Sequence, residues 1–174
     1  MSRLVGFVGS RSLPASFSPL VSSLVSAFLA RGFRVASGGV VGADQYALSA
    51  LVSQGASASG AVFSAWSVAS GFPASVRPTL ACFLASGGQV VWGLSSPGAP
   101  RQQVVSALLG RNQRLVSACS CLVAFLHGAS RGSLFTIRQA VRRGIPVYVL
   151  LCGGGASLPA DLARHCFVVR KEVV

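Results

Sequence analysis

Short apolar runs alternate along the chain with longer segments whose apolar residues recur at helical spacing, and glycine or proline stands at most of the junctions. The apolar runs predict strands at residues 4–8, 33–36, 58–63, 89–92, 121–125 and 147–151. The longer segments predict helices at residues 14–30, 42–54, 75–85, 101–118 and 132–143. After residue 152 the pattern predicts only a short helix at 158–164 and an edge strand at 167–169.

Strands that alternate with helices of this length are typical of crossover connections between parallel strands. Nearly continuous apolar runs such as 147–151 fit strands that helices cover on both faces. We therefore expect a three-layer α/β fold with a doubly wound, mostly parallel sheet. The 174 residues suit a single domain with a core at about 4–152, and the 52% of apolar residues argue against disorder.

Hydropathy and cysteine content narrow the class of protein. The uncharged stretches 13–30 and 45–76 are interrupted by prolines or glycines, so neither is expected to span a membrane. The first residues lack the pattern of a secretory signal, and we expect a cytoplasmic protein. The five cysteines are odd in number and show no C-x-x-C spacing, which favours buried thiols over a metal site or a disulfide framework.

The charge balance is strongly basic, with 15 Lys and Arg against 3 Asp and Glu and a formal net charge of +12. Such a balance favours a polyanionic partner. The acids are Asp44, Asp161 and Glu172, and the last two fall in segments that look peripheral. An active site built on paired carboxylates is therefore close to excluded, and no catalytic residue is predicted.

Three loops carry residues suited to phosphate. They follow the first, second and fifth predicted strands, at 9–11, 37–44 and 127–136, and the carboxyl ends of parallel strands are where such sheets bind ligands. The glycine spacing fits neither the dinucleotide nor the P-loop pattern. The predicted contacts to phosphate or a nucleotide are Gly9, Ser10, Arg11, Gly38, Gly39, Gly42, Asp44, Gly128, Ser130, Gly132, Ser133 and Thr136.

Simpler roles stay open for several of these residues. The first loop could be a plain turn with a surface arginine, and Asp44 suits the first turn of a helix because of the helix dipole. Ser130 or Ser133 could cap the following helix. His127 has no nearby acid in sequence, so a catalytic role is not expected.

Uncompensated arginines lie on two predicted helices. No acid at i,i+4 neutralises any of them, which favours nucleic-acid contact over a merely solvated helix face. The predicted nucleic-acid contacts are Arg11, Arg111, Asn112, Arg114, Arg131, Arg138 and Arg142. Trp66, Phe72 and Trp92 are candidates for base stacking, with burial in the core as the alternative.

Four of these segments occur in the order of a known family. They are Gly9-Ser10-Arg11, residues 37–47 with Gly-Gly and Gly-Ala-Asp, residues 111–116, and residues 132–147 ending in Gly-Ile-Pro-Val. Together they resemble the Rossmann-type domain of the DNA-processing protein A (Smf) family, within the lysine-decarboxylase-like nucleotide-binding superfamily. The resemblance covers about residues 4–152. Gln45-Tyr46 stands where the family tends to have Ala-His, and no accessory domain is expected.

The resemblance implies a non-enzymatic protein that binds single-stranded DNA in a basic groove, with a recombinase as a partner and a homodimer as the expected assembly. The phosphoribohydrolase branch uses a P-G-G-x-G-T-x-x-E motif whose glutamate is missing here, so that activity is not expected. No cofactor is predicted beyond a nucleotide or phosphate ligand. The alternatives are a nucleotide or nucleotide-derived cofactor sensor or carrier, and a protein-interaction module.

Overall fold

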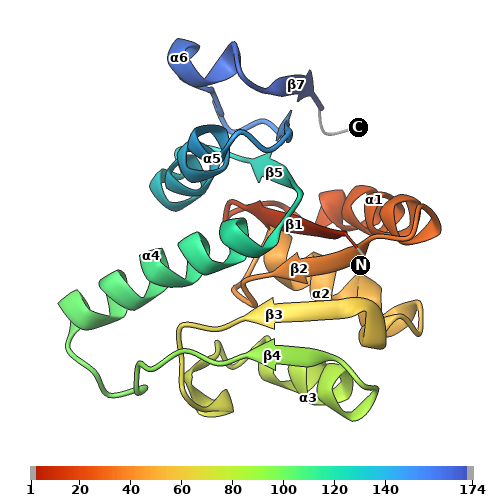
Figure 1. Cartoon of the computed structure of the whole chain (residues 1–174), viewed down its shortest axis with the longest axis vertical. Helices are drawn as coiled ribbons and strands as arrows, with labels where there is room; N and C mark the ends of the chain where they lie inside the picture. The colour runs from red at the N-terminus through yellow and green to blue at the C-terminus, as the bar shows by residue number, and fades with distance from the viewer. Residues whose placement is uncertain (1–2, 172–174) are drawn as a thin grey trace.

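A seven-stranded sheet runs through residues 3–171, the part of the chain that the computed structural model describes (Figure 1). The strands are β1 (Leu4–Gly9), β2 (Arg34–Ser37), β3 (Gly60–Phe63), β4 (Gln89–Val91), β5 (Cys121–Leu126), β6 (Val147–Leu151) and β7 (Phe167–Arg170). Their order across the sheet is β4-β3-β2-β1-β5-β6-β7, and all neighbouring pairs are parallel.

Six α-helices of the described residues cover the two faces of the sheet. They are α1 (Ser18–Ala30), α2 (Ala43–Ser53), α3 (Arg77–Ala85), α4 (Arg101–Ala118), α5 (Arg131–Arg143) and α6 (Ala160–Ala163). Short 3-10 turns occupy Ala15–Phe17, Ser57–Ser59 and Ala69–Gly71. The helices α1, α2 and α3 pack on one face, and α4, α5 and α6 pack on the other.

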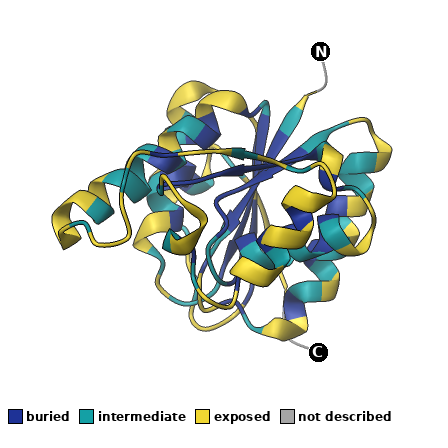
Figure 2. Cartoon of the chain, turned by 90° about the horizontal axis from the view of Figure 1, so that it is seen from below, coloured by how far each residue is buried: buried dark blue, intermediate teal, exposed yellow. Residues whose placement is uncertain are grey.

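Each face has its own apolar core, because successive side chains of a strand point to opposite sides. Along β5, Val123 and Phe125 join the core under α1–α3, whereas Leu122 and Ala124 join the core under α4–α6. Figure 2 shows the buried residues gathered along the central strands, with exposed residues on the outer sides of the helices. The small residues of α2, with Ala47 fully buried, let that helix lie close to the sheet.

The α/β fold and the doubly wound parallel sheet predicted from the sequence are confirmed. The predicted bounds of the helix at 101–118 and the strand at 147–151 coincide with α4 and β6. The third strand begins at Gly60 rather than residue 58, because Ser57–Ser59 form a 3-10 turn. Similarly, α1 begins only at Ser18, after the turn at Ala15–Phe17.

Two groups of residues bear on the sequence predictions, the cysteines and the two C-terminal acids. Cys119, Cys121 and Cys152 are buried as expected, but Cys82 is exposed on α3 and Cys166 is half-buried, so the prediction of uniformly buried thiols is wrong. Asp161 is exposed on α6, whereas Glu172 lies outside the described residues. Within residues 3–171, no helix combines the length and apolar character that crossing a membrane requires.

The strand order reverses direction between β1 and β5. From β1 the chain adds strands outward to β4, then returns through α4 to place β5 on the other side of β1. The pair is in register up to the end of β1, where Gly9 is the partner of Phe125. In an open parallel sheet, the loops at such a reversal diverge and leave a crevice at the carboxyl ends of the strands. The loops after β1 and β5 therefore face each other across this crevice.

Candidate functional site

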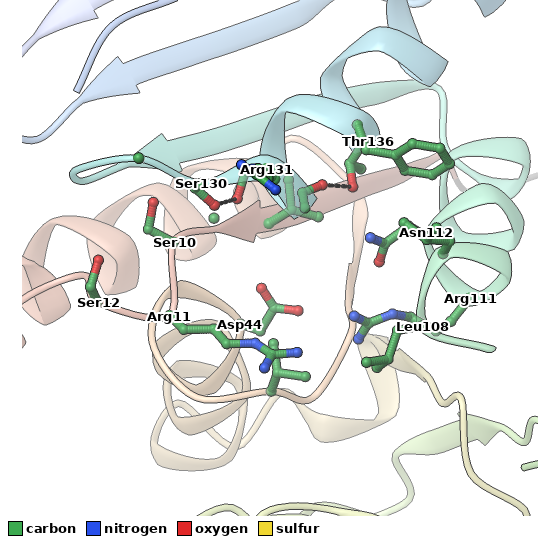
Figure 3. Close-up of a pocket in the computed structure, with 18 of the residues that line it drawn as sticks. Ser10, Arg11, Ser12, Asp44, Leu108, Arg111, Asn112, Ser130, Arg131 and Thr136 are labelled. Carbon is green, nitrogen blue, oxygen red and sulfur yellow. Dashed lines mark hydrogen bonds between the residues drawn. The ribbon is translucent and has the colours of Figure 1, made fainter. Parts of the chain in front are cut away.

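A pocket of about 670 Å³ occupies the crevice between β1 and β5 (Figure 3). Its walls come from the loop after β1, from the loop after β2 with the first turn of α2, from one side of α4 and from the start of α5. The predicted site residues that line it are Gly9, Ser10, Arg11, Asp44, Arg111, Asn112, Ser130, Arg131, Gly132, Ser133 and Thr136. The chain thus brings together segments more than 100 residues apart.

The peptide unit of Gly38 connects two walls of the pocket. Its N–H donates a hydrogen bond of 2.7 Å to Oδ2 of Asp44, and its carbonyl oxygen accepts one of 2.5 Å from Nη1 of Arg111. A Cβ at position 38 would overlap both the guanidinium group and the carboxylate. Only glycine therefore leaves room for the two side chains to approach one peptide from opposite sides.

Burial dominates the electrostatics of Asp44 and Arg111, which are 4% and 5% exposed. Loss of hydration raises the pKa of the Asp44 carboxyl to about 6, although the charge of Arg111 and the N–H of Gly38 act in the opposite direction. The same loss of hydration lowers the pKa of Arg111, opposed by the charge of Asp44. Nε of Arg111 is buried and has no hydrogen-bond partner among the described residues.

The loop after β1 is fastened to β5 through Ser10. Its N–H donates to the carbonyl oxygen of Phe125 at 2.9 Å, and its hydroxyl accepts the N–H of His127 at 2.9 Å. Next to it, Ser12 donates to the carbonyl oxygen of His127 at 3.1 Å. Arg11, held between these anchored residues, is exposed, and its side chain reaches into the pocket beneath Asp44 (Figure 3).

The start of α5 forms the opposite wall and has no side-chain cap. Ser130 occupies the cap position, but its hydroxyl donates to the Ser133 hydroxyl at 2.7 Å and makes no capping bond to the backbone. The prediction that one of these serines caps the helix is therefore wrong. The free N–H groups and the positive end of the helix dipole lie where Arg131 and Gly132 line the pocket. Such an arrangement binds anions.

Four of the glycines predicted to contact phosphate, Gly38, Gly39, Gly42 and Gly128, are not among the residues that line the pocket. A Cβ at Gly42 would meet the carbonyl oxygen of Ser10 and the backbone of Arg11, and its φ of +86° also favours glycine. Gly39, with φ of +67°, lies similarly close to Phe72. These two glycines let neighbouring segments pack closely, and so they shape the pocket from behind.

Three arginines predicted to contact nucleic acid also lie outside the pocket lining. Arg114 donates to the carbonyl oxygens of Ser64 at 2.5 Å and Trp92 at 3.2 Å, which ties α4 to the ends of β3 and β4. Arg138 and Arg142 follow Arg131 along α5 by about 10 Å and about 16 Å, at about 1.5 Å per residue.

The candidate stacking residues differ in exposure. Phe72 is 2% exposed and belongs to the core, so it is not available to stack on a base. Trp66 is partly buried and packs against the same core. Trp92 is 41% exposed, and its ring contacts Phe72 edge-on at 6.2 Å between centroids.

An apolar wall of the pocket was not predicted from the sequence. Val105, Leu108 and Leu109 line it from α4, together with Val40 and Phe135 from two other segments. The i, i+3, i+4 spacing of the three α4 residues was a readable signal of one apolar helix face. Within residues 3–171, no three His, Cys, Asp or Glu side chains gather in a way that could hold a metal ion.

Comparison with known proteins supplies a family. The family model of DNA recombination-mediator protein A matches residues 1–166. DNA processing protein A from Helicobacter pylori, whose structure concerns its single-stranded DNA binding mode, superposes with a TM-score of 0.69 and 18% identity over 86% of this chain and 65% of that one. DNA processing protein A from Streptococcus pneumoniae gives a TM-score of 0.68 and 19% identity over 97% of this chain and 58% of that one.

The fold also occurs in a different functional context. The molybdenum cofactor binding protein from Rippkaea orientalis has a TM-score of 0.63 and 16% identity over 97% of this chain and 89% of that one. No curated protein matches the chain. The chain spans less than two thirds of the length of both DNA processing proteins. At 16–19% sequence identity, all three structural matches show similarity of fold alone.

The buried carboxylate predicts a pH dependence of stability. The folded state raises the pKa of Asp44 from 3.8 to about 6, so between these values the folded state binds a proton that the unfolded state does not. The free energy of unfolding should therefore rise by about 2–3 kcal/mol as the pH falls from 7 to 4, at about 1.4 kcal/mol per pKa unit. Urea unfolding at several pH values measures this change in the free energy of unfolding. The same series on Asp44→Asn should lack this rise, and an equal rise in both proteins would contradict the assignment.

A methyl group at position 38 should disrupt the bonds to Asp44 and Arg111. Gly38→Ala is expected to lower the free energy of unfolding by about 1–3 kcal/mol, because the new Cβ overlaps two buried side chains. Gly110→Ala is the matched control, since a Cβ there meets no atom within 4 Å and the site is inside α4, where alanine is favoured by about 1 kcal/mol. Denaturant unfolding compares the two variants, and equal stability of both would refute the steric argument.

Proposed function

The chain belongs to the DNA recombination-mediator protein A family, and on that premise we propose that it binds single-stranded DNA through the pocket between β1 and β5. The observation that carries the proposal is the uncapped start of α5, with the exposed Arg11 and Arg131 on either side. A phosphodiester oxygen seated there accepts backbone N–H bonds and meets two guanidinium groups.

The positive charge buried at the base of the pocket supports the same binding mode. Arg111 is buried at its base, with an Nε that has no partner among residues 3–171. Three acids in the whole chain cannot neutralise 15 basic residues, so an anion is the natural counter-charge. Asp44 is the only acid among the residues that line the pocket, and it is held by the N–H of Gly38.

A polymer fits the arginine distribution better than a single nucleotide. Arg138 and Arg142 extend the positive charge along α5 by about 10 Å and about 16 Å beyond Arg131, further than one nucleotide in the pocket can reach. A strand that leaves the pocket along α5 would place successive phosphates near both residues. This spacing of arginines favours DNA over the nucleotide-derived cofactor that a carrier protein of the same fold would hold.

The role proposed is binding without a chemical step, in the cytoplasm. Delivery of the bound strand to a recombinase and assembly into a homodimer are parts of the same proposal. An apolar surface on the sheet edge is available for contact with another protein, because Phe167, Val168 and Val169 of β7 are exposed and Phe167 stacks on Tyr148 at 5.1 Å.

Binding to an oligo-dT strand should weaken steeply with salt, because bound phosphates release counterions. Arg131→Ala and Arg11→Ala should each lower the affinity about fivefold, or about 1 kcal/mol, and reduce the slope of log K against log salt by about 0.7. Fluorescence anisotropy between 50 and 200 mM salt measures both, with duplex DNA in parallel to test the single-strand preference.

Arg31→Ala is the control for the salt titration. Arg31 is an exposed arginine at the end of α1. Its guanidinium group bonds only the carbonyl oxygen of Ala27 among the described residues, and it is not part of the pocket. The Arg31→Ala substitution removes the same charge from the protein without changing the pocket. If Arg31→Ala flattens the slope as much as Arg131→Ala does, the effect comes from net charge and the proposed site is wrong.

A further inference from the structure

The end of β4 carries exposed apolar side chains that lie outside the pocket. Trp92 follows β4 directly and is 41% exposed, and Leu94, two positions further along, is 98% exposed. Neighbouring exposed apolar side chains of this size mark a binding surface. The core therefore does not account for this part of the chain, although one side of the Trp92 ring touches it.

The ring of Trp92 is fixed in position. Its carbonyl oxygen accepts a hydrogen bond of 3.2 Å from Nη1 of Arg114, and the N–H of Gly93 donates to the carbonyl oxygen of Trp66 at 2.9 Å. The ring meets that of the buried Phe72 at an interplanar angle of 81°, with 6.2 Å between the centroids. An aromatic ring held in this way loses little conformational entropy when a ligand stacks on it.

Two arginines bond beside this ring. Arg114 bonds to the main chain there, and Nε of the exposed Arg77 donates to the carbonyl oxygen of Phe72 at 2.9 Å. Both guanidinium groups bond neutral carbonyls, so their charge is uncompensated. Of the acids that the structure describes, Asp44 lies in the pocket and Asp161 on α6, before the opposite edge strand β7. An aromatic ring between positive charges suits a single-stranded nucleic acid better than a protein.

The ring lies on the same edge of the sheet as the pocket. All strands are parallel, so the carboxyl ends of β4 and β1 share this edge (Figure 1). In the loop after β2, Val40 lines the pocket, and the adjacent Gly39 lies against the ring of Phe72. That ring contacts Trp92. The ends of β1 and β4 are three strand spacings apart, about 14 Å, or about four stacked nucleotides at about 3.4 Å each.

We propose that Trp92 is a stacking platform for a second segment of the bound strand, with one base on its exposed ring and the adjoining phosphates attracted by Arg77 and Arg114. The inference rests on the proposed binding of single-stranded DNA in the pocket and adds a contact outside it. A bound strand then crosses the sheet edge from Arg138 on α5, past the pocket, to the end of β4. A strand too short to reach from the pocket to β4 does not use the platform.

Intrinsic fluorescence tests whether a base reaches the ring. The chain has two tryptophans, so Trp66→Phe leaves Trp92 as the only one. An oligo-dT strand of about 12 nucleotides is expected to quench this emission to saturation, because the stacked base lies on the indole ring. Trp92→Phe is the matched control, since it keeps only the partly buried Trp66, and its emission should change little. Unchanged emission of Trp66→Phe with the strand bound would overturn the platform and leave this surface to a protein contact.

Affinity tests whether the platform contributes to binding. Trp92→Ala should weaken binding of the strand of about 12 nucleotides at least about fivefold, whereas Trp92→Phe should keep most of the affinity. A strand of about 3 nucleotides, too short to join the two places, should bind the native chain and Trp92→Ala equally. Competition with a labelled strand, followed by fluorescence anisotropy, measures both lengths.

Val91→Thr is the control for the loss of exposed apolar surface. Val91 is 40% exposed on β4 directly before Trp92, and threonine keeps its β-branched shape. This variant should bind the longer strand like the native chain, and circular dichroism checks the fold of every variant. Equal weakening by Val91→Thr and Trp92→Ala, or equal weakening of both strand lengths by Trp92→Ala, would overturn the platform while leaving the pocket in place. Failure of the native chain to bind either strand at low salt would refute the proposed function as well.

Discussion

The shape of the site depends on one peptide unit, that of Gly38, which is held from two sides by Asp44 and Arg111. These bonds join the loop after β2 to α2 and to α4, although Gly38 and Arg111 are 73 positions apart in the chain. Both side chains lose hydration on burial, and that cost is offset only where each finds a partner of good geometry. This contact, with the bonds of Arg114 and the buried Leu115 and Val116, holds α4 across the crevice and so sets the width of the pocket.

The fold could be predicted from the sequence because its signals are local. The short apolar run Val147–Leu151, which follows Gly144 and Pro146, has the length and residue types of a buried strand, and the Pro100 and Cys119 boundaries of α4 are visible in the pattern of the chain. Residues 58 and 59 were assigned to a strand although they belong to the turn Ser57–Ser59, since a single 3-10 turn leaves no periodic signature. The sequence indicated that the strand order reverses somewhere in the sheet, but it did not indicate between which strands.

The site was only partly predictable, because its residues differ in what approaches them from elsewhere in the chain. Gly9 and Gly42 look alike in sequence, yet Gly9 lines the pocket and Gly42 supports the backbone of Arg11 from behind. Arg111 and Arg114 are one helical turn apart, and one faces the pocket while the other bonds the ends of two strands. Sequence spacing identifies the loops, but only the packing of distant elements separates a ligand contact from a structural one.

The position of Ser10 has a consequence for the cooperativity of the whole sheet. The strands β1–β4 and β5–β7 form two halves that meet along the β1–β5 pair, and Ser10 bonds to β5 and to the residue after it at the open end of that seam. An occupant of the pocket contacts loops from both halves at once. It therefore opposes local opening of the seam as well as global unfolding, and hydrogen exchange of β1 and β5 amides would slow together when the pocket is filled.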